Sequence, residues 1–498
     1  MIKLSDFIAK RLKELYNTEY VFMVSGGGAM HLNDSFGKYI KYVCNHHEQA
    51  CAIAAEGYAR LNQKLAVVNI TTGPGGLNCL NGVFGQWTDS VPVLYISGQV
   101  KTSTTLASCP DINLRQLGDQ EVDIVSVVKS LTKYAVTLTD PYDIEYILDK
   151  AVYIATHGRK GPVWIDVPIN LQAALIDETK LKKYLPQEDK IVLPNNASQY
   201  MQLEKLYKEA KKPLIVAGHG IRLANAKEDF IKLVNKLNIP VVTTMNGFDI
   251  IPHTNENFIG RIGTVANRAA NFVLQNADLV ITIGTRNNIR QVSYNWENYA
   301  KNAKLVCVDI DKAELDKPTI KPEIKFHSDA KDFILKALDL LPVKEHNNWN
   351  IWTEAGRIEH NPIEPYYFIN KLTKHFDKNE VVVCGNGTAF LLPFQVGEVK
   401  DNQRYIWNSG DASMGYDLPA AIGACFANNK KNTVCLAGDG SIMMNLQELQ
   451  TMIHYNLPIK LFILNNNGYI SIQQTQKNFF EGRMTACTTE SGVSIPDF

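Results

Sequence analysis

The chain of 498 residues lacks an excess of charge, a metal-binding cysteine spacing and a long apolar run. Lys plus Arg and Asp plus Glu number 51 each, so charge gives no reason to expect a nucleic acid or an anionic membrane as partner. No run approaches the roughly 18 apolar residues of a membrane-spanning helix. The nine cysteines include no CxxC pair, and their odd number fits free thiols better than a disulfide framework. We therefore expect a soluble cytoplasmic protein that binds neither nucleic acid nor membrane.

The remaining composition is that of a large globular protein, with 45% apolar and 20% charged residues. Its length predicts about three domains. Short apolar runs alternate with helical patterns, which is typical of parallel α/β sheets. We place α/β domains at 1–172, 191–342 and 362–498, with polar linkers at 171–190 and 344–361. Residues 2–16 are expected to form an amphipathic helix.

The stretch 433–469 organises the chain. An apolar run at 433–436 leads into a Gly-Asp-Gly turn, a helical pattern follows, and a second apolar run at 459–464 ends in three asparagines. This pattern predicts a βαβ unit with Asp439 and Asn466 at the carboxyl ends of two parallel strands, where open α/β sheets bind ligands. A carboxylate, an amide oxygen and a loop carbonyl suit Mg²⁺. The alternative is an ordinary turn and an ordinary Asn-rich strand end.

The Asp of that turn and the second Asn of the later pair are 27 positions apart, which resembles the signature of thiamine-diphosphate enzymes. In that family the Asp, the Asn and a carbonyl two residues later hold Mg²⁺ against the cofactor's diphosphate. The resemblance therefore implies Asp439, Asn466 and Gly468 as metal ligands.

A second part of the resemblance surrounds Glu48, which lies at the start of an otherwise small and apolar helical pattern. Such a carboxylate either caps the helix or is kept there for proton chemistry. The segment 47–60 resembles the family's His-Glu-Gln motif, whose Glu hydrogen-bonds the aminopyrimidine ring and promotes deprotonation at C2 of the thiazolium. The stretch 410–423 resembles the segment whose Met shapes the cofactor, which implies this role for Met414 and an amino-group contact for the carbonyl of Ala412. Ala412 replaces a family Gly, which we do not expect to affect a main-chain contact.

Within this family the chain is similar to acetolactate synthases. Its Gln120 matches a substrate-facing Gln and Gln474 matches another, but Asp119 and Thr475 replace a Phe and a Trp, which argues against acetolactate specificity. The resemblance implies further cofactor contacts at Gly26, Gly73, Gly75, Asn78, Gly385, Asn386, Gly387, Thr388, Gly438, Gly440, Ser441, Asn466, Tyr469 and Ile470.

The middle domain leaves two interpretations open. It has glycine turns after its predicted strands but no GxGxxG motif with a suitably placed acid. In acetolactate synthases this domain binds FAD, and Gly284 and Arg286 match one piece of that site. Asn287 and Asn288 replace the family's Asp pair, so a purely structural domain is the equal alternative.

The resemblance implies an enzyme that decarboxylates a 2-keto acid and joins the remaining unit to a carbonyl acceptor. It also implies a homodimer, or a dimer of dimers, with Glu48 of one subunit serving the metal of the other. The alternatives are a simple 2-keto-acid decarboxylase and a catalytically silent subunit. Relatives continue beyond Phe498 with a further strand and helix, so we expect the third domain to be incomplete, in a fragment or in a naturally shortened protein.

Overall fold

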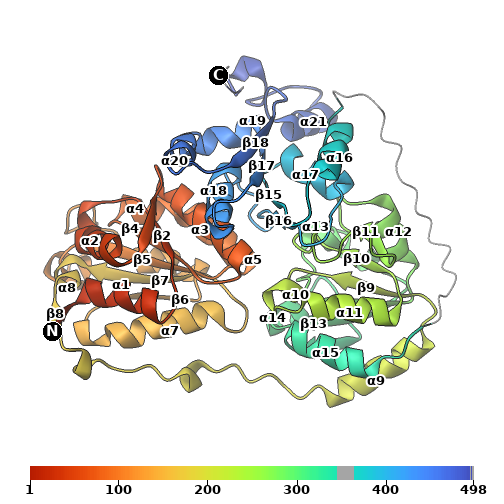
Figure 1. Cartoon of the computed structure of the whole chain (residues 1–498), viewed down its shortest axis with the longest axis horizontal. Coiled ribbons are helices and arrows are strands. Elements are labelled where there is room, and N and C mark those ends of the chain that lie inside the picture. Colours follow the sequence, from red (N-terminus) through yellow and green to blue (C-terminus); the bar gives the residue numbers. More distant parts are fainter. Residues whose placement is uncertain (345–363, 494, 496–498) are drawn as a thin grey trace. The chain divides into compact units, whose positions relative to one another are not determined.

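The computed structural model describes residues 1–344, 364–493 and 495, and it divides into two compact units (Figure 1). The first unit comprises Met1–Lys190, Val381–Gly387 and Ile406–Phe498, and the second comprises Ile191–Glu380 and Thr388–Tyr405. The stretch that we predicted as a third domain thus contributes to both units. The predicted linker at 344–361 lies, apart from its first residue, outside the described residues.

The N-terminal part of the first unit is a six-stranded parallel sheet in the order β3-β2-β4-β5-β7-β6. The amphipathic helix predicted for residues 2–16 is observed as α1. The strands are β2 (Tyr20–Met23), β3 (Lys41–Cys44), β4 (Ala66–Ile70), β5 (Val93–Gln99), β6 (Tyr134–Thr137) and β7 (Val163–Pro168). The helices are α1 (Leu4–Glu14), α2 (Met30–Tyr39), α3 (Glu48–Asn62), α4 (Pro74–Asn78), α5 (Leu80–Asp89), α6 (Ile124–Val128), α7 (Ile144–Thr156) and α8 (Ile169–Gln172).

The predicted linker at 171–190 packs against this N-terminal part. Its short strand β8 (Leu175–Ile176) pairs antiparallel with β1 (Ile2–Lys3). Leu181 is buried in the core of this part, and Lys183 Nζ lies 2.6 Å from Glu145 Oε2. The stretch predicted as a linker is therefore packed on the sheet domain, because scattered apolar residues in a polar segment can be buried without a regular period.

The C-terminal part of the chain contains a four-stranded sheet in the order β16-β15-β17-β18. Strands β15, β17 and β18 run parallel. The strands are β15 (Val381–Cys384), β16 (Arg404–Ile406), β17 (Thr433–Gly438) and β18 (Ile459–Leu464), and the helices of this part within the first unit are α18 (Asp417–Ala427), α19 (Asp439–Ile442), α20 (Glu448–His454) and α21 (Ile470–Phe479). The predicted βαβ unit is thus observed.

Helices α3 and α18 connect these two parts of the first unit, and their backbones pack directly against each other. A Cβ atom at Gly57 would lie 2.1 Å from the carbonyl oxygen of Ala420, and one at Gly423 would lie 1.8 Å from that of Ala54. Only glycine permits such a close crossing. The crossing fixes the start of α3, where Glu48 lies, within the same compact unit as the loop after β17.

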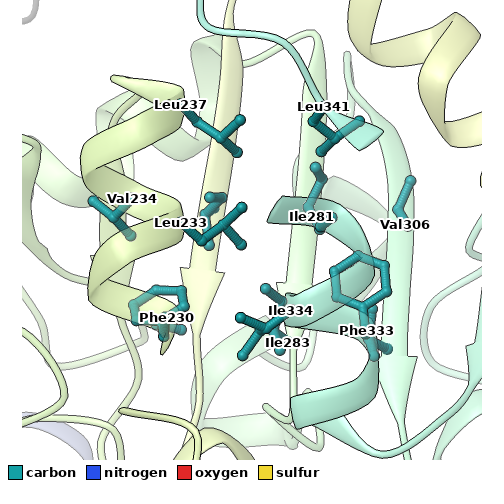
Figure 2. Close-up of a cluster of buried hydrophobic side chains, with 14 of the residues drawn as sticks. Phe230, Leu233, Val234, Leu237, Ile281, Ile283, Val306, Phe333, Ile334 and Leu341 are labelled. Carbon is teal, nitrogen blue, oxygen red and sulfur yellow. The ribbon is translucent and has the colours of Figure 1, made fainter. Parts of the chain in front are cut away.

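The second unit contains a six-stranded parallel sheet in the order β11-β10-β9-β12-β13-β14, which is the strand order of a dinucleotide-binding Rossmann fold. Phe230 and Leu233 of one helix and Phe333 of another cover one face of the sheet (Figure 2). The strands are β9 (Pro213–Ala217), β10 (Val241–Thr243), β11 (Phe258–Arg261), β12 (Leu279–Ile283), β13 (Lys304–Asp309) and β14 (Ile324–His327). The helices are α9 (Ala197–Glu209), α10 (Gly220–Leu223), α11 (Lys227–Leu237), α12 (Arg268–Asn276), α13 (Ile289–Val292), α14 (Lys312–Asp316), α15 (Ala330–Leu340), α16 (Pro365–His375) and α17 (Thr388–Val396).

The three parallel sheets with their helices confirm the predicted α/β class. All nine cysteines are free. In the described part of the chain, no helix combines the length and the apolar character needed to cross a membrane.

Candidate cofactor site

The loops after β17 and β18 meet at one edge of the C-terminal sheet, because the two strands run parallel with Gly438 paired to Leu464. Asp439 directly follows β17 and is only 2% exposed. Its Oδ2 accepts a hydrogen bond of 2.9 Å from the backbone N–H of Gly468. The structure therefore brings Asp439 together with the loop that also carries Asn466, as the spacing predicted.

The chemistry of these residues fits Mg²⁺. Asn466 Oδ1 is buried and has no hydrogen-bond partner among the described residues. A buried amide oxygen without a partner is costly, and a cation would satisfy it. Gly468 has a φ of 136°, a left-handed conformation that favours glycine. The carboxylate of Asp439, the amide oxygen of Asn466 and the carbonyl of Gly468 are the oxygen ligands that Mg²⁺ prefers.

A second group of predicted residues packs on the Gly-Asp-Gly turn. A Cβ atom at Gly440 would lie 2.3 Å from the ring of Tyr469 and 3.6 Å from Cε of Met414. Ser441 Oγ accepts a hydrogen bond of 2.9 Å from Gly415 N. The structure thus brings Met414, Gly440 and Tyr469 together, and a larger residue at 440 would displace the Tyr469 ring.

Residues 385–387 of the predicted diphosphate loop lie beside the segment that contains Met414. The side-chain N–H of Asn386 donates to the carbonyl of Ala412. A Cβ atom at Gly387 would meet no atom of the described residues within 4 Å, so its backbone is open to a ligand. Thr388, the last residue of the predicted loop, begins α17 and belongs to the second unit.

The substitution of the family Gly by Ala412 has a conformational consequence that our sequence reasoning missed. Ala412 has a φ of 56°, in the left-handed region that costs a residue with a Cβ atom about 1 kcal/mol. The expectation made from the sequence concerned only the main-chain contact of residue 412, and it stays a prediction. In this structure the main-chain carbonyl of Ala412 accepts the hydrogen bond from the Asn386 side chain.

Asp417 is a buried carboxylate of this region that the sequence analysis did not single out as a site residue. Burial raises its pKa to about 6, against the lowering effect of hydrogen bonds from Ser441 and from the backbone N–H of Leu418. A Cβ atom at Gly385 would lie 2.5 Å from Asp417 Oδ2, so the carboxyl group lies directly behind the diphosphate loop. An acidic residue at the head of an otherwise apolar helical pattern was the signal in the sequence.

Glu48 is the first residue of α3, and its neighbours in the structure include residues predicted as cofactor contacts. His47 caps the helix, because its Nδ1 accepts from Gln49 N at 3.1 Å, so Glu48 is not needed as a cap. Glu48 Oε2 accepts a hydrogen bond of 2.9 Å from Asn78 Nδ2. A Cβ atom at Gly75 would lie 3.4 Å from Glu48 Oε1. The Gly-Pro-Gly turn and Asn78 therefore surround the Glu48 carboxylate.

The start of α3 is tied to the segment after Asp439 by side chains whose pairing could not be read from the sequence. Glu448 is fully buried and accepts hydrogen bonds of 2.8 Å from Asn45 Nδ2 and from His46 N. Asn445 Nδ2 contacts Gln49 Oε1 at 3.3 Å and donates to the carbonyl of Gly415 at 2.8 Å. These bonds fix the residues on either side of Glu48.

The loop that carries Gln120 lies against the Gly-Pro-Gly turn. Gly73 has a φ of 59°, and a Cβ atom there would lie 1.9 Å from the carbonyl oxygen of Gln120. The neighbouring Glu121 carboxylate accepts from three backbone N–H groups of the preceding loop, those of Leu106, Leu117 and Gly118. The side chains of Asp119 and Gln120 are exposed.

The remaining predicted cofactor contacts are at Gly26, Gly438 and Ile470. A Cβ atom at Gly26 would lie 2.4 Å from the Cβ of Thr71, so close packing already requires a glycine there. Gly438 ends β17 and Ile470 begins α21. A Cβ atom at Gly438 would lie 3.8 Å from the carbonyl oxygen of Asn386, so this position neighbours another predicted contact.

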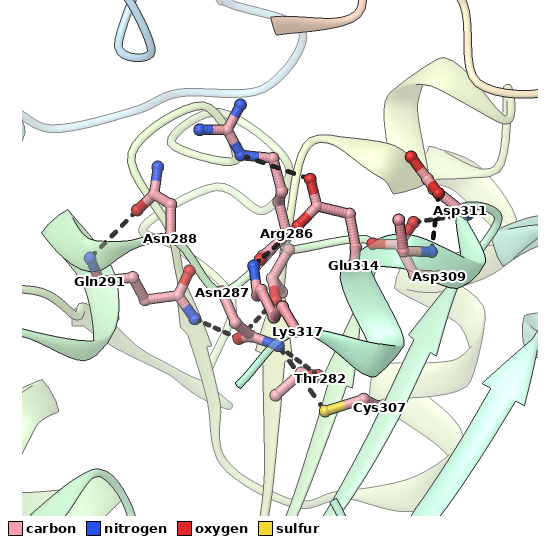
Figure 3. A network of polar contacts seen from close by, with 12 residues as sticks. Thr282, Arg286, Asn287, Asn288, Gln291, Cys307, Asp309, Asp311, Glu314 and Lys317 are labelled. Carbon is pink, nitrogen blue, oxygen red and sulfur yellow. Dashed lines mark hydrogen bonds and ion pairs between the residues drawn. The ribbon is translucent and has the colours of Figure 1, made fainter. Parts of the chain in front are cut away.

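The carboxyl ends of the strands in the second unit carry the residues considered for FAD (Figure 3). Asn287 forms hydrogen bonds within the domain. Its Oδ1 accepts from Thr285 Oγ1 at 2.7 Å and from Gln291 Nε2 at 2.8 Å. Asn288 caps α13 through a 3.2 Å bond from Gln291 N. The two asparagines therefore serve the internal structure of this domain.

The glycines at this edge pack mainly against each other. A Cβ atom at Gly218 would lie 2.2 Å from the carbonyl oxygen of Gly284, and one at Gly220 would lie 2.7 Å from the Cα of Gly284. Thr243 Oγ1 and Asn246 Oδ1, at and just after the end of β10, are buried without a hydrogen-bond partner in the part of the chain that the structure describes. Packing between the glycines thus explains them without a ligand, whereas a ligand could supply the hydrogen bonds that these two polar atoms lack.

Comparisons with known proteins match all three parts of the chain. Family models of thiamine pyrophosphate enzymes match residues 2–127 (N-terminal TPP binding domain), 202–338 (central domain) and 385–498 (C-terminal TPP binding domain). The acetolactate synthase large subunit of Lactococcus lactis is 32% identical over 498 residues, which cover 96% of this chain and 83% of that protein. That of Cyanidium caldarium is 31% identical, with 100% of this chain and 87% of the relative covered. The isozyme 1 large subunit of Escherichia coli is 28% identical, with 99% and 86% covered. The chain thus belongs to the thiamine pyrophosphate enzymes, as a thiamine-diphosphate-dependent enzyme of the acetolactate-synthase type.

Proposed function

We propose that the protein is a thiamine-diphosphate- and Mg²⁺-dependent carboligase that decarboxylates a 2-keto acid and transfers the remaining unit to a carbonyl acceptor. The observation that carries the proposal is the oxygen donor set at the carboxyl ends of β17 and β18. There, buried Asn466 Oδ1 lacks a partner among the described residues and lies in the loop beside buried Asp439. The similarity to acetolactate synthase large subunits supports the reaction class.

In this proposal the chain's own residues bind and orient the cofactor. Asp439, Asn466 and the carbonyl of Gly468 hold Mg²⁺, and Met414 supports the shape of the bound cofactor. Glu48 exchanges a proton with the cofactor's pyrimidine ring, and its bond from Asn78 holds the carboxylate in place. When bound, thiamine diphosphate supplies the carbon nucleophile and the electron sink for decarboxylation.

Two variants at opposite ends of the proposed site test it. Glu48→Gln should retain thiamine diphosphate and Mg²⁺ but lose turnover of pyruvate, because the amide cannot exchange the required proton. Asp439→Ala should lose the metal and cofactor, because an anionic ligand is removed. Calorimetric titration measures binding, and CO₂ release measures turnover. Wild-type turnover by both variants would contradict the proposed mechanism.

We also propose that the active protein is a homodimer or a dimer of dimers with its sites between subunits. Leu77, Phe84 and Trp87 on α4 and α5 are 40%, 39% and 39% exposed, and α4 also carries Asn78, which binds Glu48. Large apolar side chains exposed beside a site fit a surface that a second subunit covers. Mixed dimers of the Glu48→Gln and Asp439→Ala chains should regain one intact site. An inactive mixture would instead favour sites built from single chains.

Gln120 and Gln474 are proposed to face the substrate, with Asp119 and Thr475 changing the acceptor away from that of acetolactate synthases. Asp119 lies next to Gln120, whose backbone contacts the turn beside Glu48. Product analysis with pyruvate, with and without added aldehydes, distinguishes carboligation from simple decarboxylation. A silent subunit, the remaining alternative, would show no turnover and need not bind the cofactor.

The second unit is proposed either to bind FAD without redox use or to be purely structural. Its Rossmann strand order and the Thr243 and Asn246 atoms that lack a partner within the described residues favour a ligand, whereas the use of Asn287 and Asn288 inside the domain favours a structural role. The visible absorption spectrum of the purified protein decides, because a bound flavin is yellow. A cytoplasmic location completes the proposal, and the nine free thiols support it.

A further inference from the structure

The segment 480–491, which we call the strap, folds back onto the loop that carries Asn466 and Gly468. The carbonyl of Cys487 in the strap accepts hydrogen bonds from Tyr469 N at 3.0 Å and from Gln473 Nε2 at 2.6 Å. The same carbonyl oxygen lies 2.4 Å from the position of a Cβ atom at Gly468. One main-chain carbonyl of the strap thus contacts the loop and also the helix that follows it.

A second side chain of the same helix holds the strap. Gln476 Oε1 accepts from Thr485 N at 2.7 Å, and its Nε2 donates to the carbonyl of Thr485 at 3.1 Å. Both polar atoms of the amide are therefore paired with the backbone of one strap residue. The side chain of Cys487 is fully buried, and its Sγ lies 3.2 Å from Gln476 Oε1.

The loop under the strap contains two residues with a positive φ, which Asn and Gly adopt more readily than other residues. Asn467 and Gly468 have φ values of 58° and 136°, both in the left-handed region. Gly468 is held from two sides, by the bond from its N–H to Asp439 and by the carbonyl of Cys487 against its Cα. These two contacts hold the backbone of Gly468, whose carbonyl is a proposed metal ligand.

We propose that Gln473 and Gln476 are positioning residues for Mg²⁺ and the cofactor's diphosphate, acting through the strap to hold the metal loop in its binding conformation. The inference rests on the proposed function and assigns no ligand role to either glutamine. Groups that orient metal ligands without touching the metal typically change its affinity by about 10- to 100-fold when removed. Gln473 and Gln476 lie three residues apart on one face of α21, which explains how both reach the strap.

The experiment compares full-length wild type with Gln473→Ala and Gln476→Ala. Calorimetric titration with Mg²⁺ at saturating thiamine diphosphate should show an affinity about 10- to 100-fold weaker in both variants. Limited proteolysis after Lys477 or Arg483 should be faster, because the strap detaches. At saturating Mg²⁺ the kcat should return toward the wild-type value. Gln202→Ala is the control, because it makes the same truncation at an exposed position of helix α9. It should change none of these quantities.

Each outcome separates the two proposals. If the wild type binds Mg²⁺ and the two variants bind it within twofold of the wild type, the positioning role is refuted and the proposed function stands. If the wild type takes up neither Mg²⁺ nor thiamine diphosphate, the proposed function fails and the positioning role falls with it. Faster proteolysis with unchanged Mg²⁺ affinity would also refute the positioning role, because the strap would then be only a structural cover.

Discussion

Replacing Asp417 by Asn should make the stability of the metal-free protein less dependent on pH. Asp417 is fully buried, and its Oδ2 has no hydrogen-bond partner within the ranges that the structure describes. Burial raises its pKa to about 6, although bonds from Ser441 and Leu418 N favour the ionised form. Relative to an ordinary value of 3.8, this pKa corresponds to about 3 kcal/mol between the two protonation states.

The direction follows from linkage. Because the pKa is higher in the folded chain, the stabilising contribution is fully present below the unfolded value of 3.8 and is lost as the pH rises through about 6. The side-chain amide of the Asp417→Asn variant cannot ionise and keeps an oxygen for the 2.9 Å bond from Leu418 N. The free energy of unfolding of Asp417→Asn relative to wild type should therefore rise by up to about 3 kcal/mol between about pH 4 and about pH 8.

Urea unfolding of both proteins across this pH range measures the difference, and the comparison cancels the titration of all other groups. Asp229→Asn serves as control, because Asp229 forms a surface pair with the 68%-exposed Lys232. The control should stay within about 0.5 kcal/mol of wild type throughout. A difference between Asp417→Asn and wild type that does not change with pH would refute the reasoning.

Two further substitutions test the energetics of residues that are not among the proposed metal ligands. Asp249→Asn should lower the free energy of unfolding by about 3–5 kcal/mol, because the buried Arg222 and Arg404, which lie 2.9 and 2.7 Å from the carboxylate, would lose their counter-charge. Urea unfolding, with Asp229→Asn as the control, measures this loss. A loss below about 1 kcal/mol would contradict the prediction. Ala412→Gly should raise the free energy of unfolding by about 1 kcal/mol by relieving its left-handed conformation. A decrease in that variant, measured by the same urea unfolding, would show that Ala412 is not strained.

The sequence predicted the βαβ unit around Asp439 and Asn466 because its signals are local. An apolar run, a glycine turn and a second apolar run fix two parallel strands, and the spacing then puts both residues at the same sheet edge. The position of Glu48 at the start of a helix followed from the same kind of local signal, whereas its contacts with Asn78 and Gly75 came from the structure. The domain boundaries and the roles of the individual site residues stay predictions, which the variants above test.

Several features depended on pairings between distant parts of the chain. Asn45 and Glu448 are 403 positions apart, and neither residue carries a sign of its partner. Three glutamines follow Tyr469 closely in α21, but only the fold shows that Gln473 and Gln476 face the strap while Gln474 is exposed. The positive φ of Ala412 was equally invisible, because a left-handed alanine has no compositional signal.

The sequence by itself determined the α/β class, the metal-ligand candidates and the family resemblance, because strand periodicity, turn residues and motif spacing act over short distances. The tertiary structure decided that the predicted linker at 171–190 belongs to the first unit, that α3 and α18 cross at Gly57 and Gly423, and that the strap contacts the loop proposed to bind Mg²⁺. These outcomes depend on which surfaces pack together after folding. The residue pattern within one segment does not show which distant segment has a complementary shape.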